Sequence, residues 1–357
     1  ETGECMAGVA LLAAISSLSS PLPPTPMSAP SRALQLKSLV TSAALSDDTL
    51  DVPGVLWLEH VNLLVGAPEL ADFFYCSFLG MVREPGSSWH VNLGAQQLHL
   101  ATASSPGGEH LLSGSLGLAL PSLDALRRRA AEARERLAGT RFALEDHGEH
   151  LALTCPWGNQ LLCYQLPAGA PAAAAVPKMA LSHAGLDEGM AVRGAAGIRF
   201  VEFRVRRGTL GAVARFYAEA FGCHVTRGES SAAVAVGPSV HLVFTDDAAR
   251  PLQDEEERRM TAPEGDGMGL HICIYIAEFK RRYEWMQQKG LVFTNPRFAR
   301  LDTCDTWEQA AQSRTFRVKN IIDLDTGEPV LELEHEIRPQ RHIQFMKRTH
   351  YPEGSGT

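Results

Sequence analysis

The side chains best suited to chemistry in this sequence are histidines and glutamates that lie inside otherwise apolar segments. His271 opens the run His-Ile-Cys-Ile-Tyr-Ile, and Glu332 lies between two leucines. Glu202 and His241 are placed in the same way, each between apolar neighbours. An unpaired polar group is costly in such surroundings, so each residue needs either an ordinary hydrogen-bonded partner or a function. Imidazole nitrogens and carboxylate oxygens offer two functions, metal coordination and proton transfer.

The segments that carry these residues repeat along the chain. Two alternating segments, one around His60 and one around Glu202, are each followed by a helical stretch that ends in Phe-Tyr and, a few residues later, in Gly. A constant offset of 142 residues places His60 on Glu202 and His99 on His241 without a gap. Such a match indicates an internal duplication.

Each half also contains a second, weaker copy of the same pattern. One copy begins at Ser115 and the other at His271, and in the second copy Gly290 ends the predicted helix. The predicted helices and last strands of these copies are 123–137 with 160–164, and 278–289 with 330–337. The sequence therefore predicts an α+β fold of four βαβββ units, in tandem domains whose curved mixed sheets surround a cavity.

A linker divides the chain. Residues 167–197 are rich in Ala and Gly, which predicts an N-terminal domain at 55–166, a C-terminal domain at 198–338 and a polar tail at 339–357. Residues 1–54 are rich in Ala, Ser, Leu and Pro, a composition typical of a targeting or disordered extension. We expect a plastid or mitochondrial protein if this segment is a transit peptide, and a cytoplasmic one otherwise.

Charge and cysteine content exclude several classes of function. The net charge of −8 is spread along the chain without a basic stripe, so nucleic acid is not an expected partner. No apolar run approaches the roughly 20 residues that cross a bilayer, so a membrane is not expected either. The seven cysteines lack CxxC spacing and are typical of buried, reduced thiols.

The repeated pattern resembles the vicinal oxygen chelate superfamily, which includes glyoxalase I, extradiol dioxygenases and the fosfomycin- and bleomycin-resistance proteins. His60 precedes Tyr75 by the same distance as Glu202 precedes Tyr217. Gly-Leu-His-Ile ending at Ile272, and the later Leu-Glu-Leu-Glu, are similar to the strands that open and close the family's second unit. The resemblance covers residues 55–337 and implies the family's fold and a divalent transition metal: Zn, Ni, Fe, Co or Mn.

The resemblance implies four ligand positions in each domain. In the N-terminal domain they fall on His60, His99, Ser115 and Leu162. In the C-terminal domain they fall on Glu202, His241, His271 and Glu332. Since Ser115 and Leu162 are not ordinary ligands, the N-terminal domain on its own has a degenerate site.

Two arrangements of the units remain open. If each domain closes on itself, the metal site consists of Glu202, His241, His271 and Glu332. If the first and fourth units meet across the domains, it consists of His60, His99, His271 and Glu332. His271 and Glu332 belong to both sets, and a one-residue ambiguity in the preceding turn leaves Glu334 as the alternative to Glu332.

Chelation gives such a site its chemistry. A metal that binds two neighbouring substrate oxygens stabilises an enediolate as a Lewis acid, while a glutamate, Glu332 or Glu202, moves the carbon-bound proton. The resemblance therefore implies a glyoxalase-like lyase or isomerase acting on a small α-oxygenated carbonyl compound. The alternatives are an Fe(II) extradiol-type dioxygenase and a non-catalytic protein that binds a small molecule. Self-association as a homodimer is left open.

Two further expectations concern the surroundings of the site. The long insertion 295–317, which contains Trp307, is either a lid or a surface excursion. Seven other histidines, His90 and His150 among them, are expected at the surface.

Overall fold

The computed structural model describes residues 54–87, 89–94, 96–166, 196–237, 240–246 and 270–345. The predicted N-terminal extension apart from Gly54, nearly all of the predicted linker and the end of the tail lie outside these ranges. Within them, no helix is both long and apolar enough to span a bilayer.

The described chain forms four successive units, each consisting of a strand, a helical segment and further strands. The first contains β1 (Val55–Val65), α2 (Pro68–Ala71), the π-helix η2 (Asp72–Phe78), β2 (Val82–Arg83), β3 (His90–Leu93) and β4 (Gln96–Thr102). The second contains β5 (Ser115–Leu120), α3 (Leu123–Arg136), β6 (Ala143–Asp146), β7 (His150–Thr154) and β8 (Gln160–Gln165).

The second half repeats this order. The third unit contains β9 (Gly197–Arg204), α5 (Leu210–Phe221), β10 (Val225–Arg227), β11 (Ser231–Ala235) and β12 (His241–Thr245). The fourth contains β13 (His271–Ile276), α7 (Phe279–Gln288), α8 (Ala299–Asp302), α9 (Trp307–Ser313), β14 (Phe316–Ile322) and β15 (Pro329–Pro339). An isolated bridge between Val292 and Val318 takes the place of the fourth unit's second strand. The predicted α+β class with four βαβββ units is confirmed.

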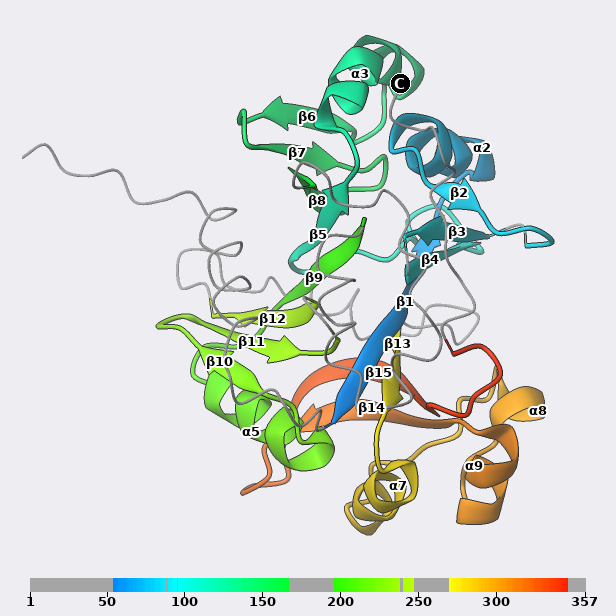
Figure 1. Ribbon diagram of the computed structural model, residues 1–357, viewed down its shortest axis with the longest axis vertical. Coiled ribbons are helices and arrows are strands. Elements are labelled where there is room, and N and C mark those ends of the chain that lie inside the picture. Colours follow the sequence, from blue (N-terminus) through cyan, green and yellow to red (C-terminus); the bar gives the residue numbers. More distant parts are fainter. Residues whose placement is uncertain are drawn as a thin grey trace, which may run out of the picture.

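The two sheets are shared between the halves of the chain. The seven-stranded sheet has the order β14-β15-β13-β1-β4-β3-β2, and the eight-stranded sheet has the order β10-β11-β12-β9-β5-β8-β7-β6. At their centres β1 pairs antiparallel with β13, and β5 pairs antiparallel with β9 (Figure 1). The first unit therefore meets the fourth and the second meets the third, which is the cross-domain arrangement of the two considered above.

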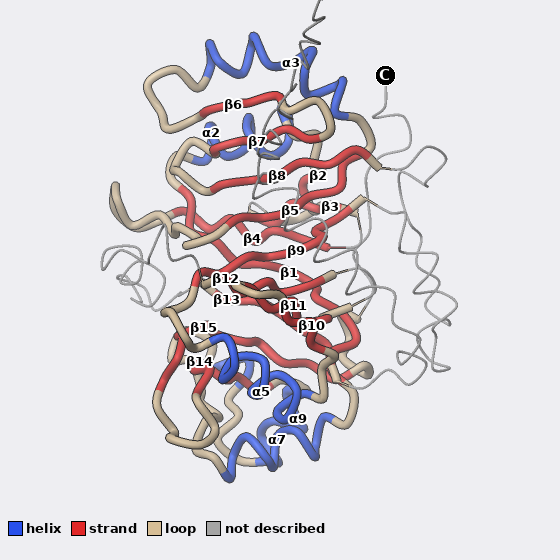
Figure 2. Tube along the Cα trace, turned by 90° about the vertical axis from the view of Figure 1, so that its left-hand side faces the viewer, coloured by secondary structure: helices blue, strands red, loops and turns tan. Residues whose placement is uncertain are grey.

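The helices pack within each half. Helix α3 packs on η2, and α5 packs on α7. Figure 2 shows these two groups at opposite ends of the molecule, with the strands between them. The helices and the sheet faces beneath them share a buried apolar cluster that includes Phe74, Phe78, Phe216 and Phe221.

Two glycines permit local features of this fold. Gly222 follows the last residue of helix α5, and its φ of 72° is left-handed, a conformation that costs glycine little. In β5, a Cβ added to Gly117 would lie 2.1 Å from the ring of Phe200 on β9, so only glycine allows these strands to pack as they do.

An irregularity in β1 decides which of its side chains leave the apolar core. The pairing of β1 with β13 slips between Leu58 and His60. Leu58 and Val61 both belong to the buried apolar cluster, which leaves Glu59 and His60 together on the opposite, polar face. β-Bulges of this kind re-aim side chains and are frequent beside active sites.

One buried polar contact joins the third and fourth units. His335 of β15 is fully buried, and burial lowers its pKa to about 4, so its ring is neutral at pH 7. Its Nδ1 donates to the carbonyl oxygen of Leu333 at 2.7 Å. Its Nε2 therefore accepts from the hydroxyl of Tyr217 on α5, at 2.8 Å.

We expect Tyr217→Phe to lower the free energy of unfolding by about 1–3 kcal/mol, because it leaves Nε2 of His335 buried without a donor. Urea unfolding measures the change. The double variant Tyr217→Phe/His335→Leu is the control, since removing both partners should recover part of the loss. Equal midpoints for the wild type and Tyr217→Phe would contradict this account of the contact.

Candidate metal centre

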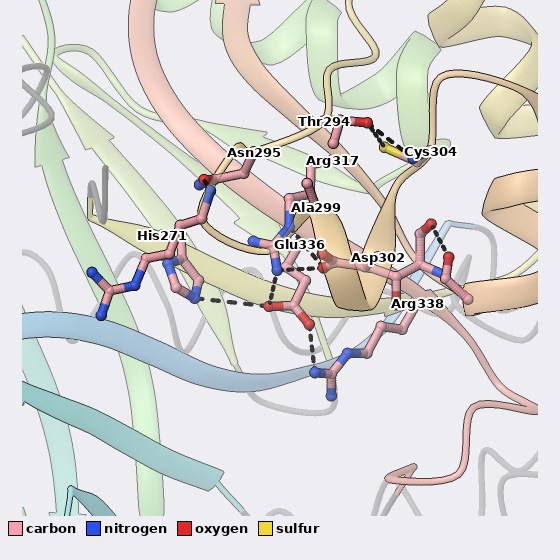
Figure 3. Close-up of polar contacts among 12 residues, drawn as sticks. His271, Thr294, Asn295, Ala299, Asp302, Cys304, Arg317, Glu336 and Arg338 are labelled. Carbon is pink, nitrogen blue, oxygen red and sulfur yellow. Dashed lines mark hydrogen bonds and ion pairs between the residues drawn. The ribbon is translucent and has the colours of Figure 1, made fainter. Parts of the chain in front are cut away.

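Three potential ligands meet on the polar face of the seven-stranded sheet. The Nε2 atoms of His60 and His271 lie 3.9 Å and 3.8 Å from Oε2 of Glu336. The three ligating atoms all lie within 4.8 Å of one another, and all three residues are buried. Figure 3 shows His271 directed at the Glu336 carboxylate.

Three adjacent strands place these side chains. His60 follows the bulge of β1, His271 begins β13, and Glu336 lies on β15, with β13 in the middle. Cys273 of β13 pairs with both His60 and Glu336 and, together with Glu59 and His60, forms a second group of potential ligands. Burial raises the pKa of the Cys273 thiol well above its usual value, which keeps it protonated at neutral pH.

The Glu59 carboxylate orients His60. Its Oε2 lies 3.1 Å from Nδ1 of His60, and its Oε1 accepts from the Tyr275 hydroxyl at 2.9 Å. With Nδ1 donating to Glu59, the lone pair of Nε2 is directed toward His271 and Glu336. Histidines that bind metal ions are commonly held by a carboxylate in this way.

Two arginines hold the Glu336 carboxylate as an anion. Oε2 accepts from Nη2 of Arg317 at 3.0 Å, and Oε1 forms an ion pair with Nη2 of Arg338 (Figure 3). Burial on its own would raise the pKa of Glu336, but Arg338 and Arg317, with His60 and His271, hold it well below its usual range. Arg338 also donates to Oε2 of Glu59 at 2.8 Å, so one guanidinium contacts both carboxylates of the centre.

Arg317 extends this network into the insertion. It donates to Oε1 of Glu334 at 2.7 Å and to Oδ2 of Asp302 at 2.7 and 3.0 Å. Glu334 also accepts from Nδ2 of Asn295 at 3.1 Å. Asn295 and Asp302 belong to the insertion predicted at 295–317, so this segment contributes to the buried site and is not merely a surface excursion.

Carboxylates outnumber guanidinium groups in this buried network. They are Glu59, Asp302, Glu334 and Glu336, against Arg317 and Arg338. Burial raises the pKa of Asp302, the carboxylate that the insertion contributes. The donor set, two imidazole nitrogens and one carboxylate oxygen, suits a divalent transition metal. The composition of this set therefore fits a metal ion held by His60, His271 and Glu336.

His99, the other histidine of the cross-domain set, lies beside this group with one nitrogen already engaged. Its ring stacks on that of His60 with centroids 3.7 Å apart. Its Nε2 lies 3.0 Å from Oε1 of Gln97, whose own amide nitrogen donates to Glu84 at 3.1 Å. The Gln97 oxygen is thus an acceptor, and Nε2 of His99 donates to it. His90, expected at the surface, is half-buried and stacks on His99 at 3.7 Å.

The glutamates expected as ligands lie elsewhere on β15. Glu332 is 27% exposed and pairs with Nζ of Lys319 at 2.6 Å. Glu334, the alternative, is occupied by Arg317 and Asn295. Of the three glutamates at alternate positions of this strand, the structure brings Glu336 to the histidines.

Glu202 and His241 lie in the eight-stranded sheet and not beside His271. Glu202 accepts from Ser115 at 2.7 Å and from Thr245 at 2.9 Å. Phe200, two residues before Glu202 on β9, is buried in a small apolar cluster on which Leu162 packs. The structure therefore does not bring together Glu202, His241, His271 and Glu332, because the first two follow the third unit into the other sheet.

The sequence analysis missed Glu336, Glu59, Arg317 and Arg338. The alternation Glu-Leu-Glu-His-Glu-Ile-Arg on β15 carried the signal for Glu336 and Arg338, since it sends every second residue to one face. His150, also expected at the surface, is 4% exposed within β7.

Comparisons with known proteins find distant structural similarities. No protein-family profile and no curated protein sequence matches the chain. Glyoxalase I from Zea mays is similar over 80% of this chain and 92% of that structure, at 12% identity and a TM-score of 0.45. The 2,3-dioxygenase LapB from Pseudomonas sp. KL28 is similar over 80% and 93%, at 14% identity and a TM-score of 0.24. Homoprotocatechuate 2,3-dioxygenase from Brevibacterium fuscum is similar over 81% and 73%, at 14% identity and a TM-score of 0.25.

The described strands and helices themselves confirm the predicted layout, four successive units in two curved mixed sheets. No activity follows from that fold.

His241 provides a test of the structure away from the candidate centre. Burial, with a smaller contribution from His224, lowers its pKa from 6.5 to about 4. The unfolded chain therefore binds a proton near pH 6.5 that the folded chain binds only near pH 4. We expect the free energy of unfolding to fall by about 3 kcal/mol for this group as pH drops through that window, and to be fully retained above it.

Urea unfolding at several pH values measures this dependence, with His241→Gln as the comparison. Between pH 6.5 and 4, the free energy of unfolding should fall less in the variant than in the wild type. Near pH 8, the slope of this free energy against pH should be the same for both proteins. Parallel curves across the acid window would show that His241 is not buried as described.

Proposed function

We propose that this chain is a metal-dependent enzyme of the dioxygenase type, which holds Fe(II) through His60, His271 and Glu336 and binds a small substrate by two neighbouring oxygens. The observation that carries the proposal is the meeting of two imidazole nitrogens and one carboxylate oxygen within 4.8 Å. Non-haem ferrous oxygenases use this donor set, which leaves coordination positions open.

The residues around the set support stable binding. When bound, a ferrous ion supplies Lewis acidity toward substrate oxygens and one-electron chemistry with dioxygen. Glu59 fixes the ring of His60, and Arg317 and Arg338 keep Glu336 ionised and in place. Burial of all these side chains limits the access of water to the site.

The state and positions of Glu336, Glu332 and Glu202 favour this reaction over a glyoxalase-like isomerisation. An isomerase needs a group that accepts a carbon-bound proton, and such a base works best with a pKa near the operating pH. The pKa of Glu336 is held well below its usual range. Glu332 pairs with Lys319, and Glu202 lies in the other sheet. A protein that only binds a small molecule would share the site but consume no oxygen.

We expect the full chain, reconstituted without oxygen, to hold one ferrous ion, and His271→Ala and Glu336→Gln to lose it. Each variant lacks a ligand, so its affinity should fall by more than the roughly 10–100-fold caused by loss of an outer partner. Glu332→Gln is the matched control and should keep its iron. Iron analysis after desalting measures the content, and an oxygen electrode with a catechol detects turnover.

Two results would count against the proposal. Iron retained by both His271→Ala and Glu336→Gln would place the metal elsewhere. A preference for zinc or nickel, with isomerisation and no oxygen uptake, would favour the lyase or isomerase alternative.

We expect Glu59→Gln to weaken Fe(II) binding about 10–100-fold, because Nδ1 of His60 then loses its charged acceptor. Competition with a chromophoric chelator measures the affinity. Tyr275→Phe is the control: it removes a hydroxyl from Glu59 but keeps the carboxylate, so its effect should be smaller. Equal affinity in Glu59→Gln and the wild type would mean that Glu59 does not support the ligand.

A further inference from the structure

Asn62 lies on the polar face of the seven-stranded sheet, directly beside the candidate centre. It pairs with His271 on β13 and with His99 on β4. Paired residues of neighbouring strands project to the same face of a sheet, so the Asn62 side chain projects from the same face as these two rings. It follows His60 by two residues, which places it about 7 Å further along β1.

The side-chain amide of Asn62 is buried with an unused donor. The residue is 3% exposed, and among the described residues its Nδ2 has no hydrogen-bond partner. Asn92, a buried asparagine on β3 of the same sheet, shows the usual arrangement: its Nδ2 donates to Glu84 at 2.7 Å. A buried donor without an acceptor lowers stability, and a substrate oxygen bound at the candidate centre would supply the missing acceptor for Asn62.

An apolar wall follows Asn62 along the same face. Leu64, two residues further on β1, is buried with Ala101 of β4, and Phe298 of the insertion packs against them. The Phe298 ring lies 6.2 Å from that of His271, and the Arg317 guanidinium lies 4.4 Å from its centre. The face therefore presents, in order, the candidate metal ligands, an amide donor and an apolar wall.

We propose that Asn62 binds the substrate, donating a hydrogen bond from Nδ2 to one of its oxygens, and that Phe298, Leu64 and Ala101 receive an apolar substituent. The substrate of the proposed function then carries an aromatic or alkyl group on the side of Phe298. This inference rests on the proposed function, because the metal ion fixes the position of the oxygens.

Two hydroxamates test the inference in the full chain loaded with Fe(II) without oxygen. Both chelate through two neighbouring oxygens, but benzohydroxamate carries a phenyl group where acetohydroxamate carries a methyl group. Calorimetric titration should show tighter binding of benzohydroxamate to the wild type. Asn62→Leu should weaken both probes about tenfold or more, since each loses a hydrogen bond to a charged oxygen. Phe298→Ala should weaken benzohydroxamate alone.

Thermal unfolding separates binding from a structural role. Asn62→Leu removes an unused buried donor, so its Tm should equal or exceed that of the wild type, and its iron content should be unchanged. Asn92→Leu is the matched control, and its Tm should fall because Glu84 loses a donor. Asn62→Asp keeps the shape but replaces the donor with an acceptor, so it should also weaken both probes.

The failures of the two proposals are distinguishable. A wild type that takes up no metal overturns the proposed function and this inference with it. A metal-loaded Asn62→Leu that binds both probes as the wild type does overturns the inference alone. So does an Asn62→Leu whose Tm falls as far as that of Asn92→Leu, because Asn62 would then be a structural residue.

Discussion

The antiparallel pairing of β1 with β13 is the constraint on which the candidate centre depends. These strands come from opposite halves of the chain, and their pairing sets His60 and His271 on one face. Because β15 lies on the other side of β13, Glu336 completes the group from the next strand. No unit holds more than two of the three side chains, so the centre exists only when the first and fourth units share a sheet.

The buried charges are a second constraint on the structure, because each buried charged group is stable only when its ion-pair partners are in place. Removing one member of a buried ion pair typically costs about 3–5 kcal/mol, since the other charge is left uncompensated. Arg317 contacts three carboxylates, one of them from the insertion, while Arg338 joins Glu336 to Glu59. The insertion, β14 and β15 are therefore held together by the same charges that fix the position of Glu336.

Local patterns in the sequence predicted the fold well. The alternation of apolar and polar residues predicted the strands, and the repeated Phe-Tyr and Gly positions marked the ends of the helices in two of the units. Both kinds of pattern involve only a few consecutive residues, so they can be recognised in the sequence alone. His60 and His271 were found in the same way, as polar residues in apolar strands.

The choice among the glutamates of β15 depends on register, which local patterns do not contain. Alternation sends Glu332, Glu334 and Glu336 to one face alike. The parallel pairing with β13 sets Glu334 opposite His271 and Glu336 opposite Cys273. Arg317 and Asn295 engage Glu334, so Glu336 is the glutamate whose oxygen lies near both histidines. The bulge at Glu59 was not predicted for a similar reason. One extra residue in a strand does not change the amino-acid composition in a way that the sequence reveals.

The two sheets show how the duplicated units have diverged. In the eight-stranded sheet, Glu202 accepts from two hydroxyl groups and Phe200 fills the neighbouring position against Gly117. In the seven-stranded sheet, the corresponding face carries imidazoles, ion-paired carboxylates and the unused donor of Asn62. A buried polar face of this kind is costly unless a partner, ligand or ion completes it. The eight-stranded sheet also buries polar groups, but there the hydroxyl groups of Ser115 and Thr245 complete Glu202. In the seven-stranded sheet two imidazoles and a carboxylate meet within 4.8 Å, and the proposed function rests on this difference.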